Sequence, residues 1–492
     1  MMNNTRPNIL KTGTPLFCDL YHLTMSQAWF LDGKANEIKT SEAFFRKCPF
    51  GGSYLIATGT AEFIDWINNW HFEKKDIDYL RSLKNENGTP KFAEDFLDFL
   101  QEQKLQISID SVDEGEIVFP NEPIYSITGP TWQVDIVEAA LLNIFNSQSL
   151  IATKAARSVY AASLDGKQRP ILEFGLRRCQ ELGGFSATRA AFIGGISGTS
   201  NTAAGKYYNI PVSGTMAHSF IMSYEKEIDA FKAYLRANPN NTTLLVDTYD
   251  TREGIKNAIQ ASLETQIPLN GIRIDSGDLS YWGKEARKLL DQSGFRKTKI
   301  VASNDLDEHI IENLIMVQKA PFDIFAEGTK LVTAYDTPAL GGVFKTKQYL
   351  GAPKIKIAEG KTTIPGKTNI LRIEKNGMYE GDIICQYACD LLENNCLRQN
   401  ITSHTLGSLN SSIHTFNKGE KARLLLKPII VNGKIISYPE TNLNILQNRV
   451  KNNLNKLDNS YKRLSNPHIY GVGLESKIYN LQQHLIKTHQ GK

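Results

Sequence analysis

Polar and ionisable side chains recur in this chain at one kind of position, at or just beyond the end of a short apolar run. The runs ILEF (171–174), IPVSG (210–214), TLLVD (243–247) and GIRID (271–275) show the pattern. The residues placed in this way are Glu173, Arg177, Thr215, His218, Asp247, Asp275, Asn304 and Gly328. An imidazole can act as a base or a nucleophile, and a carboxylate can stabilise a developing positive charge. Helix capping explains one or two such residues but explains a whole set poorly, so we predict a catalytic site.

The elements that must position these residues read as repeated strand–helix units. Seven apolar runs occur, at 171–174, 191–196, 210–214, 243–247, 271–275, 299–304 and 323–328. The segments REGIKNAIQASLET and YWGKEARKLLDQSG between them have the 3.6-residue periodicity of helices. Seven consecutive units favour a (β/α) barrel over an open sheet, and the carboxyl ends of barrel strands meet at one mouth. Arg273 and Asp275 are alternate residues of one such strand, so their side chains should point the same way.

The segments on either side of this region have a mixed pattern. A helix-like stretch (19–30) and a strand-like one (41–50) come first, and strand-like runs such as IKIAEG (355–360) follow residue 345. A chain of 492 residues also exceeds the size at which a single core usually keeps growing. We therefore expect a barrel over 136–345, with 1–135 and 346–492 packed together as a second, α+β domain.

The composition is that of an ordinary globular protein. A net charge of +4 is too small to indicate a nucleic-acid or membrane surface as partner. No segment approaches the roughly 20 apolar residues that span a bilayer. The stretch MMNNTRPNILKTGTP has no apolar run of the kind found in signal peptides. We expect a cytoplasmic protein that binds neither nucleic acid nor membrane.

The six cysteines are scattered, and only Cys385, Cys389 and Cys396 lie close in sequence. Their C-x3-C-x6-C spacing is not the usual spacing of zinc ligands. Free, reduced thiols are therefore expected in preference to a metal site.

Two small-residue loops could hold phosphate. They are AEGTK (326–330) and PALGGVFK (338–345), which place Lys330 and Lys345 next to glycine-rich backbone. Backbone N–H groups in such loops can cradle phosphate oxygens. Each loop taken alone is equally consistent with a tight turn.

Nine stretches, taken in order, resemble the motifs of the nicotinate phosphoribosyltransferases. They are DLYHLTM (19–25), FFRKCPFGG (44–52), EFGLRRCQ (173–180), SGTMAHSF (213–220), LLVDTYDT (244–251), RIDSGDL (273–279), ASND (302–305), EGTKLVT (327–333) and LGGVFK (340–345). The resemblance implies an α/β protein with an irregular TIM-like (β/α) barrel and a second domain, usually a homodimer with shared active sites. It also implies condensation of nicotinate with phosphoribosyl pyrophosphate to nicotinate mononucleotide and pyrophosphate, coupled to ATP hydrolysis and requiring Mg²⁺. That reaction belongs to NAD salvage.

The resemblance assigns binding roles to individual residues. Tyr21, reaching across the dimer, and Phe174 would stack the pyridine ring, each contributing about 1 kcal/mol beyond area burial. Arg177 and Arg273 would grip a carboxylate or phosphate through their guanidinium groups, and Thr215 would contact the substrate. The phosphate groups would be held by Arg46, Gly328, Thr329, Gly341, Gly342 and Lys345, with Lys330 near the first loop.

Three residues are implied to be catalytic. His218 matches the family's histidine that ATP phosphorylates transiently. A helix expected to begin at this residue would keep the imidazole neutral and would favour the phosphorylated anion. Asp247 could accept the other ring N–H and fix the tautomer, and Asp275 matches the acid beside the ribose hydroxyls, where it would steady positive charge at the anomeric carbon. The residues that hold Mg²⁺ are not indicated.

The chain departs from the family pattern at three positions. Cys18 stands where a Thr is usual, Ala326 where a Gly is usual, and Glu327 where an apolar residue is common. A carboxylate at 327 would repel phosphate unless it points away or holds Mg²⁺.

Four alternatives remain open. Nicotinamide phosphoribosyltransferase carries an Asp at the position aligned with Asn201, and a neutral Asn suits nicotinate better. Quinolinate phosphoribosyltransferase would leave the His218 segment without an ATP-linked purpose. A different barrel enzyme could use His218 and Asp275 as acid and base. An inactive, purely binding homologue would be expected to lack His218, Asp275 or Arg177, and all three are present.

Overall fold

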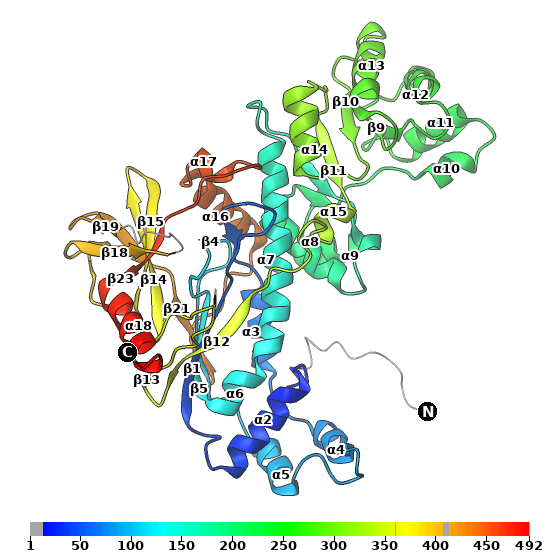
Figure 1. The fold of residues 1–492 in the computed structure, drawn as a ribbon. Coiled ribbons are helices and arrows are strands. Elements are labelled where there is room, and N and C mark those ends of the chain that lie inside the picture. The colour runs from blue at the N-terminus through cyan, green and yellow to red at the C-terminus, as the bar shows by residue number, and fades with distance from the viewer. Residues whose placement is uncertain (1–12, 360, 407–412, 492) are drawn as a thin grey trace. The chain divides into compact units, whose positions relative to one another are not determined.

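The computed structural model describes residues 13–359, 361–406 and 413–491, and it divides into two compact units. The central unit comprises residues 150–338, and the outer unit comprises 1–149 and 339–492. The outer unit takes strands from both ends of the chain, which is the arrangement expected for the second domain. The predicted domain boundaries after residues 135 and 345 stay a prediction. The two units divide after residue 149, which lies inside α7 (Glu138–Ala161), and this helix is continuous across the division (Figure 1).

The central unit is built on a six-stranded parallel sheet in the order β7-β6-β11-β10-β9-β8. Its strands are β6 (Ile171–Glu173), β7 (Gly198–Thr199), β8 (Thr243–Leu245), β9 (Gly271–Ile274), β10 (Lys299–Ala302) and β11 (Ile324–Glu327). These strands are short apolar runs, and most of their residues are buried, as in a parallel sheet covered on its faces by helices. In Figure 1, α12 (Thr251–Thr265) lies beside β9, α13 (Leu279–Gln292) lies beside β9 and β10, and α11 (Glu227–Ala237) packs against α12.

The helical segments of the central unit follow its strands in the expected alternation. They are η1 (Leu176–Arg178), α8 (Gly183–Ile193), α9 (Thr202–Tyr208), α10 (His218–Met222), α11 (Glu227–Ala237), α12 (Thr251–Thr265), α13 (Leu279–Gln292), α14 (Glu308–Glu312), η2 (Asn313–Val317) and α15 (Thr329–Val332). Close packing fixes one of them, because a Cβ at Gly254 of α12 would lie 1.9 Å from the carbonyl oxygen of Val246. Any larger residue at 254 would push α12 away from the end of β8.

Two of the seven predicted strands are wrong. The run at 191–196 forms the end of α8, because its small and apolar residues continue a helix that buries most of its side chains. The run at 210–214 makes only an isolated bridge between Val212 and Thr199. The described residues of the central unit therefore form a curved parallel sheet of six strands, and its completion into the irregular (β/α) barrel stays a prediction.

The outer unit contains two large sheets and a two-stranded one. The first has the order β13-β12-β1-β5-β3-β21-β22, the second has the order β16-β17-β20-β14-β15-β23-β18-β19, and β2 pairs with β4. Strands from the N-terminal segment are β1 (Ile38–Phe44), β2 (Leu55–Ile56), β3 (Ser108–Ser111), β4 (Ile117–Val118) and β5 (Tyr125–Pro130). Strands after residue 339 are β12 (Val343–Tyr349), β13 (Ala352–Pro353), β14 (Thr368–Lys375), β15 (Met378–Gln386), β16 (Leu392–Glu393), β17 (Cys396–Leu397), β18 (Ile401–Thr405), β19 (Ile413–Phe416), β20 (Lys421–Leu424), β21 (Lys427–Val431), β22 (Lys434–Ile435) and β23 (Val472–Glu475). The strand predicted over 355–360 is absent from its described part, residues 355–359, which have no regular structure.

Helices cover these sheets from both parts of the chain. They are α2 (Leu20–Leu31), α3 (Thr60–Asn68), α4 (Lys74–Ser82), α5 (Glu94–Glu102), α6 (Thr131–Ile136), α16 (Leu443–Asn455), α17 (Asn459–Lys462) and α18 (Ser476–His489).

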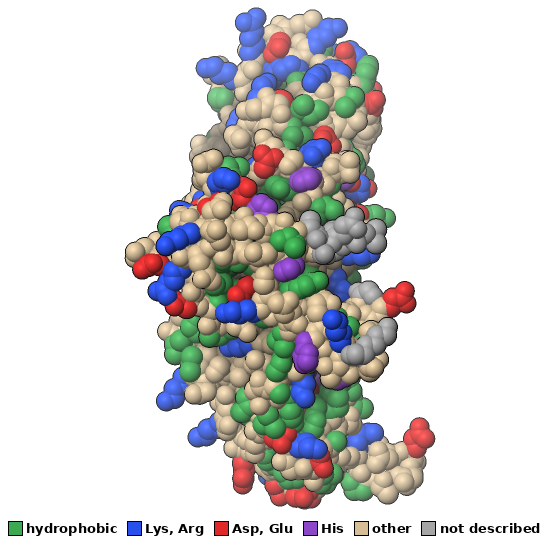
Figure 2. Space-filling model, turned by 60° about the vertical axis from the view of Figure 1, so that its left-hand side comes forward, with side chains coloured by type: hydrophobic (Ala, Val, Ile, Leu, Met, Phe, Trp, Pro, Cys, Tyr) green, Lys and Arg blue, Asp and Glu red, His purple; other side chains and the backbone are tan. Residues whose placement is uncertain are grey.

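Within the described ranges no helix is both long and apolar enough to cross a membrane. Figure 2 shows basic and acidic side chains interspersed on the face drawn, without a large area of one sign.

Candidate active site

Arg273 is the centre of the polar network at the carboxyl end of β9. Its guanidinium donates from Nε to the Ser303 hydroxyl (2.8 Å), from one terminal nitrogen to the Thr215 hydroxyl (3.1 Å) and from the other to Asp275 (2.9 Å). The guanidinium also lies 5.5 Å from the centre of the Phe174 ring. The ends of β6, β9 and β10 and the loop that carries Thr215 thus contact one guanidinium group. Arg273 and Asp275 lie on the same side of their strand, as their alternation in sequence predicts.

Asp275 is held as a carboxylate. Burial alone would raise its pKa, but the charge of Arg273, the hydroxyl of Ser303 and the nearby His218 together lower the pKa below its usual value. Its side chain is 28% exposed, so a ligand can still reach it. The group therefore carries a negative charge at neutral pH, beside a cation and within reach of solvent.

Asp247 supports this arrangement from the end of β8. Its Oδ2 accepts hydrogen bonds from the backbone N–H of Asp275 (2.9 Å) and from the Ser276 hydroxyl (2.6 Å). Its Oδ1 is buried and has no hydrogen-bond partner among the described residues. Asp247 therefore positions Asp275 and keeps one oxygen available for another ligand.

His218 begins α10, a helix of five residues, as the sequence predicts. Its Nδ1 lies 3.1 Å from the Thr248 hydroxyl, and its Nε2 lies 3.8 Å from Oδ2 of Asp275. The expectation that Asp247 holds the other ring nitrogen is wrong, since the neighbouring Thr248 does so and Asp247 bonds to the end of β9. The side chain is 39% exposed, so the imidazole is both oriented and accessible.

The end of β6 presents Phe174 and Arg177 on a short loop. Phe174 is half-buried, and Arg177 is exposed in η1. Glu173, just before them, is buried and accepts hydrogen bonds from the N–H of Gly175 and the hydroxyls of Thr188 (3.0 Å) and Thr199 (2.5 Å). Glu173 thereby ties the loop to α8 and β7.

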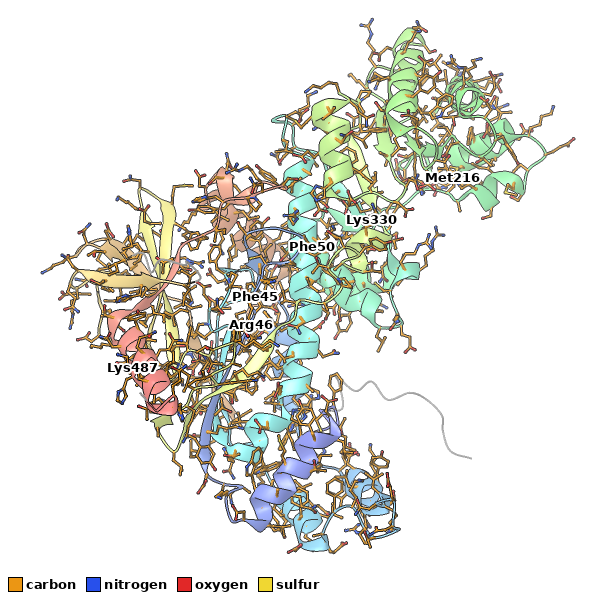
Figure 3. The ribbon with its side chains drawn as sticks, viewed as in Figure 1. Phe45, Arg46, Phe50, Met216, Lys330 and Lys487 are labelled. Atoms are coloured by element: carbon orange, nitrogen blue, oxygen red, sulfur yellow. The ribbon has the colours of Figure 1, made fainter. Side chains whose placement is uncertain are left out.

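Gly328 and Thr329 follow β11 and begin α15, while the preceding Glu327 is 0% exposed. Burial is the main cause that raises the pKa of Glu327 to about 8, and neither carboxyl oxygen has a hydrogen-bond partner among the described residues. The side chain therefore lies inside the protein and does not repel a phosphate at the loop. Lys330, labelled in Figure 3, is not a free charge but pairs with Asp307 at 2.7 Å.

The outer unit brings together most of its own predicted phosphate-binding residues. In the pairing of β1 with β12, Phe44 faces Val343, so Arg46 just beyond β1 lies near the Gly341–Gly342 loop just before β12 (Figure 3 labels Arg46). Gly342 packs so closely that a Cβ there would lie 2.2 Å from the Asn146 side chain. The Lys345 amine donates to its neighbour's carbonyl, that of Phe344.

Tyr21 lies elsewhere in the outer unit, in the first turn of α2. It is 49% exposed, and its ring centre is 4.0 Å from that of His22. Its exposure leaves the ring able to contact another molecule.

Asn201 is a buried helix cap. Its Oδ1 accepts from the N–H of Ala204 at the start of α9, and its Nδ2 lies 3.4 Å from the carbonyl oxygen of Gly184. Because an Asp caps helices equally well, the argument that Asn201 selects nicotinate by facing it receives no support from this geometry.

Three contributors to the site were missed by sequence reasoning. They are Thr248, Ser303 and the positioning role of Glu173. Thr248 follows Asp247 and Ser303 precedes Asn304, so adjacency to a predicted strand-end residue was the signal for these two, whereas Glu173 was itself named but not as a positioning residue. Only the folded structure shows which side chain turns toward the site. Among the described residues, no cluster of three or more His, Cys, Asp or Glu side chains could hold a metal ion.

This arrangement defines a class of protein: an α/β enzyme whose acid, guanidinium and imidazole groups project from the carboxyl ends of parallel strands. Family models for nicotinate phosphoribosyltransferase match the chain in three parts, the N-terminal domain over residues 16–146, the main family over 170–368 and the C-terminal domain over 367–482. The nicotinate phosphoribosyltransferase of Bacillus subtilis is 40% identical over 477 residues, covering 94% of each chain. The enzyme of Caenorhabditis elegans is 34% identical over 529 residues, covering 94% of this chain and 92% of its own. The chain belongs to the nicotinate phosphoribosyltransferase family.

The fold agrees with this assignment. The crystal structure of human nicotinic acid phosphoribosyltransferase superposes with a TM-score of 0.80 at 24% identity, covering 95% of this chain and 99% of the human one. The enzyme therefore condenses nicotinate with phosphoribosyl pyrophosphate to give nicotinate mononucleotide and pyrophosphate, a step of NAD salvage.

Proposed function

We propose that this transferase is coupled to ATP through phosphorylation of His218. The observation that supports this is the orientation of the ring, with Nδ1 against the Thr248 hydroxyl at 3.1 Å and Nε2 on the side of Asp275. With the proton on Nδ1, donated to Thr248, the Nε2 lone pair is free to attack the γ-phosphorus of ATP. The P–Nε2 bond forms as the bond to the β-bridging oxygen breaks, and ADP leaves. Arg273 offsets the repulsion between the phosphoryl group and Asp275.

The residues around Arg273 would hold the two organic substrates. Phe174 presents an aromatic face to the pyridine ring, and Arg177 and Arg273 supply guanidinium groups for its carboxylate or for a phosphate. Thr215 contacts the substrate from the loop before α10. As the bond from the anomeric carbon to pyrophosphate breaks, the ionised Asp275 stabilises the positive charge on the ribose, and the pyridine nitrogen then forms the new bond.

Mg²⁺ fits the two acidic residues of this site. Mg²⁺ is usually bound by one or two carboxylates together with substrate phosphates and water. Asp247 keeps a buried oxygen without a partner among the described residues, and Arg273 and Ser303 bond to Oδ1 of Asp275 while its Oδ2 lies 3.8 Å from Nε2 of His218. These two carboxylates would hold the ion, which supplies charge neutralisation for the pyrophosphate.

We further propose a cytoplasmic homodimer with shared active sites. Arg46, Gly341, Gly342 and Lys345 would bind phosphate groups in the outer unit, as Gly328 and Thr329 would in the central unit. The exposed Tyr21 would stack on nicotinate bound by the partner subunit. The curved parallel sheet would then be the wall of an irregular TIM-like barrel.

A product assay tests the coupling. The enzyme is given phosphoribosyl pyrophosphate and Mg²⁺ with nicotinate or nicotinamide, with and without ATP. Nicotinate should be the better substrate, and ATP should stimulate the wild type but not His218→Ala. A His218→Ala variant that ATP still stimulates would contradict the phosphohistidine, whereas a preference for nicotinamide would contradict the choice of base.

A further inference from the structure

Two cysteine thiols touch each other in the outer unit. Cys385 lies near the end of β15 and is fully buried in an apolar cluster with Leu371, Ile383 and Leu397. Cys389 follows four residues later, after the turn at Tyr387, and its Sγ lies 3.2 Å from the Sγ of Cys385. The contact therefore joins one sulfur inside this apolar cluster to one that is partly exposed.

The two thiols differ in reactivity. The S–H of Cys385 is the main cause that lowers the pKa of Cys389, and the backbone N–H of Leu391 adds to it, while burial and the charge of Glu475 oppose it. The pKa of Cys385 is raised, because its proton is held by the neighbouring sulfur and its burial disfavours the thiolate. Cys389 is also partly exposed, so it combines access with the greater thiolate character.

Two other cysteines show the contrast. Burial raises the pKa of Cys18 to about 12 and that of Cys179 to about 11. These thiols stay protonated at neutral pH and are poor nucleophiles.

We propose that Cys385 and Cys389 are a redox-active pair that hydrogen peroxide or an organic peroxide converts reversibly to a disulfide. The thiolate of Cys389 attacks a peroxide oxygen, the O–O bond breaks, and the leaving oxygen takes a proton to give water or an alcohol. The resulting sulfenic acid is attacked by the sulfur of Cys385, which loses its proton while the hydroxyl leaves as water. Both sulfurs are oxidised, the peroxide is reduced by two electrons, and a dithiol reductant reverses the reaction by exchange.

The disulfide would act on a turn that joins the two large sheets of the outer unit. Tyr387 in this turn donates its hydroxyl proton to Asp110 of β3, and the Lys367 amine lies 2.7 Å from the same carboxylate and 3.7 Å from the centre of the Tyr387 ring. Tethering both ends of the turn restricts its opening, so we expect slower proteolysis there after oxidation.

Peptide mass spectrometry of the full-length enzyme tests the pair. The protein is treated with hydrogen peroxide, its remaining thiols are blocked with N-ethylmaleimide, and the peptide spanning 385–389 is analysed. We expect this peptide to lack two hydrogen atoms and to carry no label, and dithiothreitol should restore two labelled sites. Cys389→Ser should abolish the change.

A matched variant removes the remaining cysteine of the trio. Cys396→Ser should leave the oxidised peptide unchanged, since the contact involves only Cys385 and Cys389. The proposal is overturned if Cys389 pairs with Cys396 instead, or if both thiols of the wild type remain fully labelled at a peroxide dose that oxidises any other cysteine of the chain.

Discussion

Two carboxyl groups at the same edge of the central sheet are held in opposite states. Asp275 follows β9 and is an accessible carboxylate whose pKa is lowered, with Arg273 and Ser303 bonded to it. Glu327 ends β11, two strands away, and is fully buried with its pKa raised to about 8. One is charged at neutral pH and the other is predominantly protonated.

The difference teaches that position at a strand end does not by itself make a residue functional. Successive side chains of a strand point to opposite sides, so neighbouring strand ends can send one carboxyl toward the solvent-accessible edge and another into the packing against helices. Glu327 lies among Ser158, Lys154 and Glu308, all of which influence its ionisation. Four variants test this comparison, from the largest expected effect to the smallest.

Removing the charge of Asp275 should have the largest effect. Asp275→Asn can still accept hydrogen bonds from Arg273 and Ser303 but cannot stabilise positive charge on the ribose. We expect kcat to fall by about 10²- to 10³-fold, the usual cost of losing one electrostatic contact to a transition state. Steady-state kinetics measures it, with the thermal unfolding midpoint as a control for folding. Activity within about threefold of the wild type would show that the charge is not used, since such a change is far below that cost.

Replacing the guanidinium of Arg273 should have the second-largest effect. Arg273→Lys keeps the positive charge but cannot reach Ser303, Thr215 and Asp275 at once. Hydrogen bonds to charged groups contribute about 1.5–3 kcal/mol each, so losing one should lower kcat/KM by about 10- to 100-fold. Kinetics with nicotinate as the varied substrate checks this, and an unchanged kcat/KM would contradict the central role of Arg273.

Glu173→Gln should weaken substrate binding more than turnover. An amide cannot accept from the Gly175 N–H and both threonine hydroxyls as the carboxylate does, so the loop that carries Phe174 becomes looser. Because the Glu173 carboxylate is buried and bonded to Gly175, Thr188 and Thr199, we expect it to act through the loop, with about a tenfold rise in KM for nicotinate and a smaller change in kcat. Thr188→Val, which removes one of the donors, should give an intermediate value. A fall in kcat with an unchanged KM for nicotinate in both variants would refute a positioning role for Glu173.

Glu327→Gln should leave catalysis nearly unchanged but alter the pH dependence of stability. The folded-state pKa of Glu327 is raised from 4.5 to about 8, so the wild type is stabilised fully below about pH 4.5 and loses that stability as pH rises toward 8. Each pKa unit corresponds to about 1.4 kcal/mol, which makes the total a few kcal/mol. The variant should lack this slope between pH 5 and 8.

Urea unfolding midpoints at several pH values measure the slope. As pH rises through this range, the urea midpoint of the wild type should fall relative to that of Glu327→Gln. Parallel plots of midpoint against pH for the two proteins would show that Glu327 is ionised in the folded protein. A large loss of transferase activity in the variant would instead place Glu327 in the phosphate-binding loop.

Sequence patterns predicted the strand–helix alternation, the family and the meeting of Arg273 with Asp275, because all three follow from local periodicity and motif order. They could not distinguish a strand from the apolar end of α8 at 191–196, since a short apolar run fits either element. They also placed Asp247 beside His218, whereas the structure places Thr248 there. The side chains of adjacent residues point in different directions, and the sequence alone does not show which of the two points toward the histidine. The residues that influence the ionisation of Glu327 include Lys154 and Ser158 of α7, which are far from it in sequence.

The most direct test of the account is the covalent state of His218. The enzyme is incubated with ATP labelled at the γ-phosphate and Mg²⁺, without nicotinate, and the protein-bound label is mapped under alkaline conditions that preserve phosphohistidine. The account predicts label on His218, none in His218→Ala, and slower labelling in Thr248→Val, which no longer orients the ring. A wild-type enzyme that shows ATP-stimulated synthesis of nicotinate mononucleotide but carries its label on another residue, or carries none, would contradict it.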